Sequence, residues 1–145
     1  MTRARVLFLC VHNSARSQMA EGILRHLAGD RYEVASAGNL PTSVHPLAVD
    51  VLAERGVDIS AHRAKSVGEL LGQEFDLAVT LCGDDAPGSC PFFPGAKRYE
   101  HVPFPDPAAR GGDEEETREA FCQVRDALWD WIVARFVEGG EGHEG

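Results

Sequence analysis

Positive charge is scarce in this sequence: 14 Lys and Arg residues stand against 23 Asp and Glu, a formal net charge of −9 over 145 residues. Binding to nucleic acid or to an anionic membrane surface generally needs a basic face, so the composition argues against both partners. Seven of the acids are concentrated in 113–116 and 138–144. The rest of the chain is therefore close to neutral and leaves room for a local positive site.

Long apolar runs are also missing. No segment approaches the ~18 apolar residues of a membrane span, and the run 6–9 is shorter than the ~7–15 residue core of a signal peptide. We therefore expect a cytoplasmic protein. In that reducing compartment cysteines are expected to be thiols, metal ligands or redox catalysts rather than structural disulfides. The sequence has four of them: Cys10, Cys82, Cys90 and Cys122.

Apolar runs and helical spacings alternate along the chain, with no internal repeat and no linker that would divide it. The predicted strands are 5–10, 32–37, 75–81 and 98–102, and the predicted helices are 17–27, 46–55 and 114–137. Ser66 and Glu69 have the spacing of a capping box for one more short helix. The pattern predicts a single α/β domain over 1–137, with a four-stranded parallel sheet flanked by helices, and a flexible acidic tail over 138–145.

The loop after the first predicted strand, 10–17, has the clearest chemistry. In an open α/β sheet, ligands bind at the carboxyl ends of strands, where helix N-termini point. A helix N-terminus binds tetrahedral oxyanions through its free N–H groups and stabilises a nearby thiolate. Arg16 can hold two oxygens of an oxyanion with its planar guanidinium. Cys10 and Arg16 together predict a nucleophile beside an anion clamp.

The Cys-x5-Arg spacing alone is weak, because such a match arises by chance in about one sequence in three of this composition. A strand before the loop, a helix after it and the hydroxyls of Ser14 and Ser17 strengthen the case. The competing interpretations are a buried structural thiol at Cys10 and a solvated Arg16. The second is disfavoured, because a cation opposes the dipole at a helix start unless an anion sits there.

The twelve residues CVHNSARSQMAE at 10–21 resemble the signature of the thioredoxin-coupled arsenate reductases, which share the fold of the low-molecular-weight tyrosine phosphatases. The resemblance extends from Val6 to about Val137. It implies that Cys10 attacks arsenate, that Asn13 shapes the loop and that Ser17 donates to the thiolate. It also implies an oxyanion-binding set, namely Val11, His12, Asn13, Ser14, Ala15, Arg16 and Ser17.

Cys82 follows the third predicted strand, on the same sheet edge as Cys10, and seven residues with the turn chemistry of a mobile loop separate it from Cys90. Metal ligation lacks evident partners nearby, so a redox pair and two unrelated loop thiols remain. The resemblance implies the redox pair: Cys82 attacks the Cys10 adduct, and Cys90 then resolves the disulfide. The family usually has six residues between these cysteines, which raises the question whether this bridge can close.

Asp106 lies in the loop after the fourth predicted strand, in the segment PFPDPA. Asp-Pro is a common turn initiator, and that interpretation stands beside the role of a general acid. Oxygen leaving from arsenic or phosphorus must be protonated, and a bound oxyanion favours the neutral form of a nearby carboxyl. The resemblance implies the catalytic role for Asp106.

The resemblance also concerns partners and ions. Thioredoxin is the implied electron donor, and we expect a monomer with no tightly bound cofactor and no resident metal centre. Asn13, Glu21 and Ser36 match positions where some relatives hold a monovalent cation, and the ammonium of Lys65 is a candidate substitute for that ion. Cys122 lies mid-helix and is expected to be structural.

Two other functions stay open. A low-molecular-weight tyrosine phosphatase needs only Cys10, Arg16 and Asp106, but such enzymes usually follow Asp-Pro with aromatic residues that flank phosphotyrosine, whereas Ala108 and Ala109 follow here. A phosphatase would also leave the other two candidate cysteines unused, although a reductase with this loop is expected to show weak phosphatase activity. A non-catalytic thiol redox sensor predicts a disulfide switch that does not depend on the arginine.

Overall fold

Four parallel strands in the order β2-β1-β3-β4 form the sheet, as predicted. The computed structural model describes residues 3–83, 90–109 and 112–139. Its strands are β1 (Ala4–Cys10), β2 (Tyr32–Gly38), β3 (Phe75–Cys82) and β4 (Ala96–Phe104). Its helices are α1 (Arg16–Ala28), α2 (Pro46–Ala53) and α3 (Glu114–Ile132), with the short helices η1 (Val67–Leu70), η2 (Pro107–Ala109) and η3 (Val133–Glu138).

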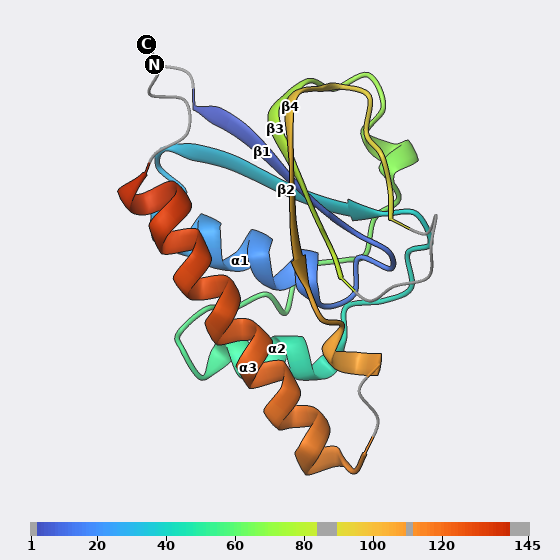
Figure 1. Ribbon diagram of the computed structural model, residues 1–145, viewed down its shortest axis with the longest axis vertical. Helices are drawn as coiled ribbons and strands as arrows, with labels where there is room; N and C mark the ends of the chain where they lie inside the picture. The colour runs from blue at the N-terminus through green and yellow to red at the C-terminus, as the bar shows by residue number, and fades with distance from the viewer. Residues whose placement is uncertain (1–2, 84–89, 110–111, 140–145) are drawn as a thin grey trace.

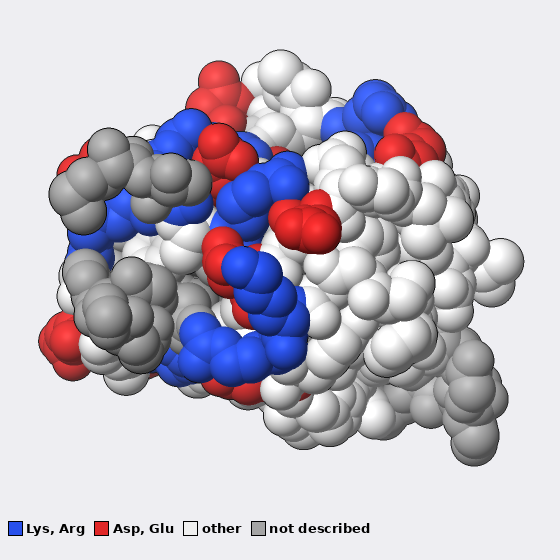
Figure 2. All heavy atoms as spheres, turned by 90° about the horizontal axis from the view of Figure 1, so that it is seen from above, with Lys and Arg blue, Asp and Glu red and all other residues white. Residues whose placement is uncertain are grey.

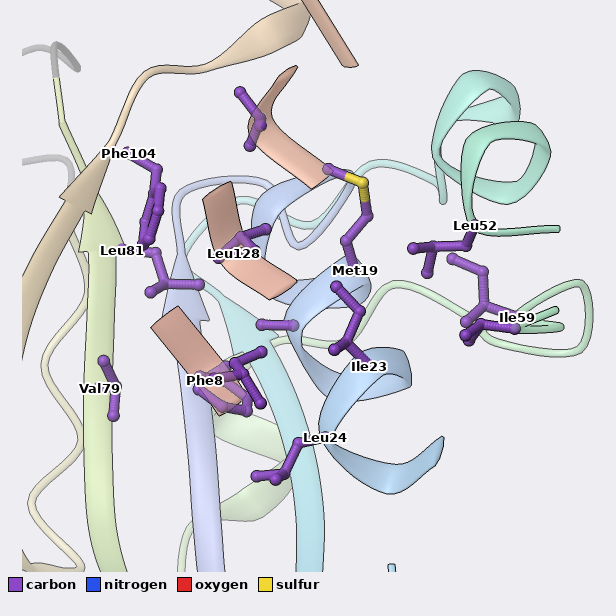
Figure 3. Close-up of a cluster of buried hydrophobic side chains, with 14 of the residues drawn as sticks. Phe8, Met19, Ile23, Leu24, Leu52, Ile59, Val79, Leu81, Phe104 and Leu128 are labelled. Carbon is purple, nitrogen blue, oxygen red and sulfur yellow. The ribbon is translucent and has the colours of Figure 1, made fainter. Parts of the chain in front are cut away.

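The helices α1, α2 and α3 cover one face of the sheet, and η1 lies on the other side (Figure 1). The main core fills the space between the sheet and the three long helices. Figure 3 shows its centre, where Phe8 of β1 and Leu81 of β3 approach Met19 and Ile23 of α1 and Leu128 of α3. Burial of this apolar surface holds α1 against the carboxyl end of β1, where the predicted loop lies.

A second, smaller cluster covers the opposite face of the sheet. Leu7 and Leu9 of β1 pack there with Leu70 of η1 and with Phe93, which lies in the segment before β4. The alternation of the β1 side chains between the two clusters explains why β1 reads as a continuous apolar run. Side chains therefore cover both faces of β1, and a ligand can reach the sheet only at the ends of its strands.

The last helix begins as predicted and ends differently. Asp113 caps α3 and forms a reciprocal capping box with Glu116. The predicted helix to residue 137 is α-helical only to Ile132, and Val133–Glu138 then form a π-helical turn. Within this turn the carbonyl oxygen of Phe136 accepts a hydrogen bond from Tyr32 Oη at 3.0 Å.

Two more boundaries differ from the prediction. The helix α2 ends at Ala53 rather than at residue 55, and the chain then turns at Gly56, whose φ of 82° lies in the left-handed region that favours glycine. The strand β4 is four residues longer than predicted, because its exposed positions are ordered by pairing with β3 rather than by their own burial. Glu138, assigned to the predicted tail, ends η3, and residues 140–145 of that tail lie outside the described residues.

Basic side chains are matched by acids on the surface. Figure 2 shows that most Lys and Arg side chains of the face seen from above lie in one group, with Asp and Glu side chains among them. Glu33 pairs with both Arg3 and Arg5, and Arg135 pairs with Glu100. Within the described part of the chain, none of the helices is both long and apolar enough to cross a membrane.

Candidate active site

Residues 11–15 form a tight loop between the end of β1 and the start of α1. Backbone N–H groups of Leu40, Thr42 and His45 donate to the carbonyl oxygens of residues 11, 12 and 14, at 3.0 to 3.2 Å. In a trans peptide the C=O of one residue and the N–H of the next point in opposite directions. The N–H groups of residues 12, 13 and 15 therefore point away from the 40–45 segment. These N–H groups lie just before the start of α1, where such donors can bind an oxyanion.

Two residues make this loop geometry possible. Asn13 has a φ of 49°, in the left-handed region that Asn tolerates better than most residues. Gly38, at the end of β2, packs so closely that a Cβ there would lie 2.5 Å from the carbonyl oxygen of Val11 and 2.7 Å from that of Cys10. A side chain at residue 38 would thus displace the loop.

Cys10 is the last residue of β1 and is 2% exposed. Its Sγ lies 2.9 Å from Ser17 Oγ on the first turn of α1, the contact expected for a serine that donates to the sulfur. Its side chain packs in one apolar cluster with Val11 and Cys82, and Cys90 packs against that cluster. The structure thus brings three of the four cysteines together around the loop.

Arg16 opens α1 and is 2% exposed. Its Nη1 donates to the carbonyl oxygen of Phe104 at the end of β4, at 3.1 Å, so β4 fixes the direction of the guanidinium. Its Nη2 lies 3.8 Å from Asp106 Oδ2. A solvated arginine, the alternative interpretation, is wrong.

Asp106 lies between β4 and η2, and the backbone N–H of Ala108 donates to its Oδ1 at 3.0 Å. The Asp-Pro turn is therefore real, and it also orients the carboxyl toward the arginine. A small cavity of about 60 Å³ opens between these groups. Its lining consists of Cys10, His12, Ser14, Ala15, Arg16, Thr42, Asp106 and Ala108. Thr42 and Ala108 were not among the predicted binding residues.

Cys82 is bonded to Cys90, with their Cα atoms 5.9 Å apart. The seven intervening residues therefore allow the bridge to close, which answers the question raised by the unusual spacing. Cys82 is the last residue of β3 rather than the first residue after it, and it is 4% exposed. Residues 84–89 of the predicted mobile loop lie outside the described residues. Cys10 and Cys122 are free thiols.

A buried polar network supports the loop from the side of α1. Asn13 Nδ2 donates to Ser17 Oγ at 2.7 Å and to Ser36 Oγ at 2.9 Å, and Ser36 Oγ donates to Glu21 Oε1 at 2.5 Å. Of these residues, Asn13, Glu21 and Ser36 match the positions where a monovalent cation was considered. Lys65 Nζ lies 3.8 Å from the same Glu21 oxygen. A lysine ammonium therefore stands beside the carboxylate where a cation was expected.

The network continues to His62 through Gln18, whose part in it the sequence did not predict. Gln18 Nε2 donates to Asn13 Oδ1 at 2.9 Å, and Gln18 Oε1 lies 2.9 Å from His62 Nδ1. His62 Nε2 lies 3.1 Å from Arg25 Nη1, which can only donate, so Nε2 accepts and Nδ1 carries the proton. Burial, followed by the charges of Arg25 and Lys65, lowers the pKa of His62 below its usual value against the opposing effect of Glu21.

The described residues contain no group of three or more His, Cys, Asp or Glu side chains that could hold a metal ion. What the site does offer is a thiol, a guanidinium and a carboxyl around a small cavity, with the Cys82–Cys90 disulfide packed against the thiol of Cys10. This arrangement suits attack by sulfur on a tetrahedral oxyanion, followed by thiol–disulfide exchange.

Comparisons with known proteins agree with this chemistry. The profile of the family described as low molecular weight phosphotyrosine protein phosphatase matches residues 5–135. The chain is 41% identical to an arsenate reductase of Bacillus licheniformis over 141 residues, which cover 97% of this chain and the whole of that protein.

Two solved structures have the same fold. A thioredoxin-dependent arsenate reductase of Corynebacterium glutamicum has a TM-score of 0.65 at 31% identity, over 94% of this chain and 63% of that one. A low molecular weight protein tyrosine phosphatase of T. tengcongensis has a TM-score of 0.67 at 26% identity, over 94% and 99% of the two chains. Reductases and phosphatases thus both resemble this chain over nearly its full length.

Proposed function

The chain belongs to the low molecular weight phosphotyrosine protein phosphatase family, and from this premise we propose that it is an enzyme that reduces arsenate to arsenite with electrons from thioredoxin. The observation that carries the proposal is the position of the Cys82–Cys90 disulfide, in one apolar cluster with the free thiol of Cys10. Hydrolysis of a phosphate ester through a cysteinyl-phosphate needs one thiol and transfers no electrons, whereas reduction of As(V) to As(III) consumes two electrons, which two thiols supply when they form a disulfide.

Arsenate binds in the cavity between the loop and Asp106. Arg16 contributes a planar pair of donors, and the N–H groups of residues 11–16 contribute the rest of the oxyanion site. The hydrogen bond from Arg16 to Phe104 stops the guanidinium from rotating, so little entropy is lost when the anion binds. The hydroxyl of Ser14 lies on the same loop, and that of Ser17 lies on the first turn of α1.

In the first step the thiolate of Cys10 attacks arsenic. An As–S bond forms, an As–O bond breaks, and Asp106 protonates the oxygen that leaves. The carboxyl is 24% exposed, which allows it to regain a proton from water. Arg16, 3.8 Å from this carboxyl, neutralises negative charge on both the carboxylate and the oxyanion.

In the second step the thiolate of Cys82 attacks the sulfur of Cys10. An S–S bond forms, the As–S bond breaks, and its electron pair stays on arsenic, which leaves as arsenite. Cys90 then attacks Cys82 and releases the Cys10 thiolate. The resulting state, with Cys82 bonded to Cys90 and Cys10 free, is the arrangement of cysteines in the structure. Two electrons pass from the cysteines to arsenic in each cycle.

Thioredoxin is then a co-substrate, and the reaction needs no tightly bound cofactor. The cytoplasm holds the reduced thioredoxin that such a cycle consumes, so we place the enzyme there. We also take the enzyme to be a monomer. The Lys65 ammonium takes the place of a bound monovalent cation beside Glu21.

A phosphatase is the second candidate, since the same loop binds phosphate esters. Two features favour the reductase. Ala108 lines the cavity at the point after Asp-Pro where an aromatic ring would flank a phosphotyrosine, and the paired cysteines have no task in ester hydrolysis. Weak phosphatase activity of the reductase remains an expected side reaction.

The test is arsenate-dependent NADPH oxidation in the presence of thioredoxin and thioredoxin reductase, with p-nitrophenyl phosphate hydrolysis measured in parallel. We expect Cys10→Ser, Cys82→Ser, Cys90→Ser and Arg16→Ala each to abolish turnover, and only Cys10→Ser and Arg16→Ala to abolish hydrolysis. Full turnover by Cys82→Ser would contradict the relay. Hydrolysis as fast as arsenate reduction would favour the phosphatase. A thiol switch that persists in Arg16→Ala, without arsenate turnover by the wild type, would favour a redox sensor.

A further inference from the structure

Phe92 is the one phenylalanine of the sequence whose side chain is exposed to solvent. The sequence has seven phenylalanines, all of which the structure describes, and six of them are buried. Phe92 is 67% exposed. Large exposed aromatic side chains are uncommon on a protein surface and are enriched where proteins bind one another.

Phe92 does not stand alone. Its ring stacks on that of Tyr99, with the centroids 5.1 Å apart and the planes 14° from parallel, and Tyr99 is itself 40% exposed. Tyr99 belongs to β4, the edge strand of the sheet (Figure 1). The two rings form one apolar platform, which we call the Phe92–Tyr99 pair.

Phe92, one ring of this pair, lies two residues after Cys90 of the disulfide. Between Cys90 and Pro94 burial alternates: Pro91 and Phe93 are buried, whereas Cys90 is partly exposed and Phe92 is exposed. Phe93 is anchored in the smaller core by an edge-on contact with Phe75 at 5.5 Å. Alternate residues of an extended segment lie on opposite sides, so Phe92 faces outward while Phe93 faces the core, and Cys90 stays partly exposed although it is bonded to Cys82.

The proposed function requires a protein to reach this disulfide. Cys82 is 4% exposed and Cys90 is more exposed, so an incoming thiolate attacks Cys90 Sγ. A bond forms from the reductant sulfur to Cys90, and the Cys82–Cys90 bond breaks with its electron pair on Cys82 as thiolate. The second thiol of the reductant then attacks the mixed disulfide, Cys90 leaves as a thiol, and the reductant departs oxidised by two electrons.

A protein bonded to Cys90 must also cover Phe92. Two residues of extended chain span at most about 7 Å, whereas a specific interface buries about 800 Å² on each partner and therefore extends well beyond that distance from its centre. We propose that the Phe92–Tyr99 pair is the docking surface for thioredoxin, the dithiol reductant. This inference rests on the proposed function, in which thioredoxin reduces the Cys82–Cys90 disulfide. The pair supplies the central apolar anchor that such interfaces need.

The test uses the protein oxidised to its Cys82–Cys90 disulfide and measures the rate of reduction by quenching, alkylation and mass spectrometry. Reduced thioredoxin and dithiothreitol are compared as reductants. We expect Phe92→Ser to lower the second-order rate constant with thioredoxin about tenfold, equivalent to ~1.4 kcal/mol, and to leave the rate with dithiothreitol unchanged. Phe92→Tyr keeps a stacked ring and is the matched control, with wild-type rates for both reductants.

Each contrary outcome is distinct. Equal thioredoxin rates for wild type and Phe92→Ser would overturn the docking surface and leave the proposed function standing. Equal losses with both reductants would place the effect in the disulfide itself and also overturn it. A wild-type dimer that Phe92→Ser dissociates, with unchanged thioredoxin rates, would assign the pair to contact between copies of this chain. Arsenite formation in a single turnover of the reduced protein tests the proposed function separately, and Phe92→Ser is expected to retain it.

Discussion

The Sγ atom of Cys10 lies 2.9 Å from the Oγ atom of Ser17, and both side chains are buried. A hydroxyl that donates to sulfur stabilises the thiolate, which is the nucleophile. We predict that Ser17→Ala lowers the rate of Cys10 alkylation by iodoacetamide at pH 7 roughly tenfold, because a hydrogen bond to a charged group contributes about 1.5 kcal/mol. Mass spectrometry follows the Cys10 peptide, and the free thiol of Cys122 is the internal control. An unchanged rate at Cys10 would contradict the donor role of Ser17.

Asp106 is expected to act on the leaving oxygen rather than on binding. We predict that Asp106→Asn lowers the rate of arsenite release in a single turnover by about 100-fold or more, the usual contribution of a general acid. The amide can still accept from the N–H of Ala108, so the turn is retained. Arsenate affinity should stay within a few-fold of wild type, because Arg16 holds the anion. A loss of affinity without a loss of rate would assign Asp106 to binding only.

His62 makes stability depend on pH. Its pKa is lowered by burial and by the charges of Arg25 and Lys65, so the unfolded chain binds a proton that the folded protein resists. The neutral ring contributes its full stability above the unfolded value of about 6.5, and that stability is lost as the pH falls below 6.5. We predict that the free energy of unfolding falls more steeply between pH 6.5 and pH 5 in wild type than in His62→Gln. Urea titrations at several pH values provide the measurement, and parallel curves would contradict the prediction.

The Lys65 ammonium is predicted to replace a bound cation beside Glu21, because it places a positive charge next to the buried carboxylate. In Lys65→Met the buried carboxylate of Glu21 loses the positive charge of this ammonium. A potassium ion can then bind beside the carboxylate and replace that charge. We predict that KCl raises the melting temperature of Lys65→Met more than tetramethylammonium chloride does at the same concentration, and that wild type responds equally to the two salts. If the two salts change the melting temperatures of both proteins in the same way, Lys65 does not replace a bound cation.

Much of the fold is predictable because buried positions are occupied by apolar residues, whose spacing along the sequence indicates strands and helices. The central strands β1 and β3 are apolar runs closed on both faces, and the caps at Ser66 and Asp113 are local patterns. The edge strand β4 was predicted too short, since its exposed residues are held by hydrogen bonds to another strand. The π-helical turn after Ile132 depends on contacts from β2 that no local pattern reveals.

The candidate site divides in the same way. Cys10, Arg16 and the loop between them form one continuous motif, and its position between a predicted strand and a predicted helix, rather than the spacing alone, indicated an oxyanion site. The contact between Gln18 and His62 joins residues 44 positions apart and depends on how the 59–66 segment folds back over α1. Closure of the Cys82–Cys90 bridge likewise depends on the distance between two chain segments rather than on the number of residues between them. Thr42 carried a weak signal, as a hydroxyl residue following β2 at the same sheet edge.

The order of the cysteine relay can be observed in a trapped intermediate. Reduced Cys90→Ser is treated with one equivalent of arsenate, without thioredoxin, and analysed for arsenite and by peptide mapping. We predict one equivalent of arsenite per protein and a disulfide between Cys10 and Cys82. Cys82→Ser under the same conditions should give neither product. Arsenite release from Cys82→Ser, or a Cys90→Ser protein that releases arsenite with Cys10 unbonded, would contradict the relay.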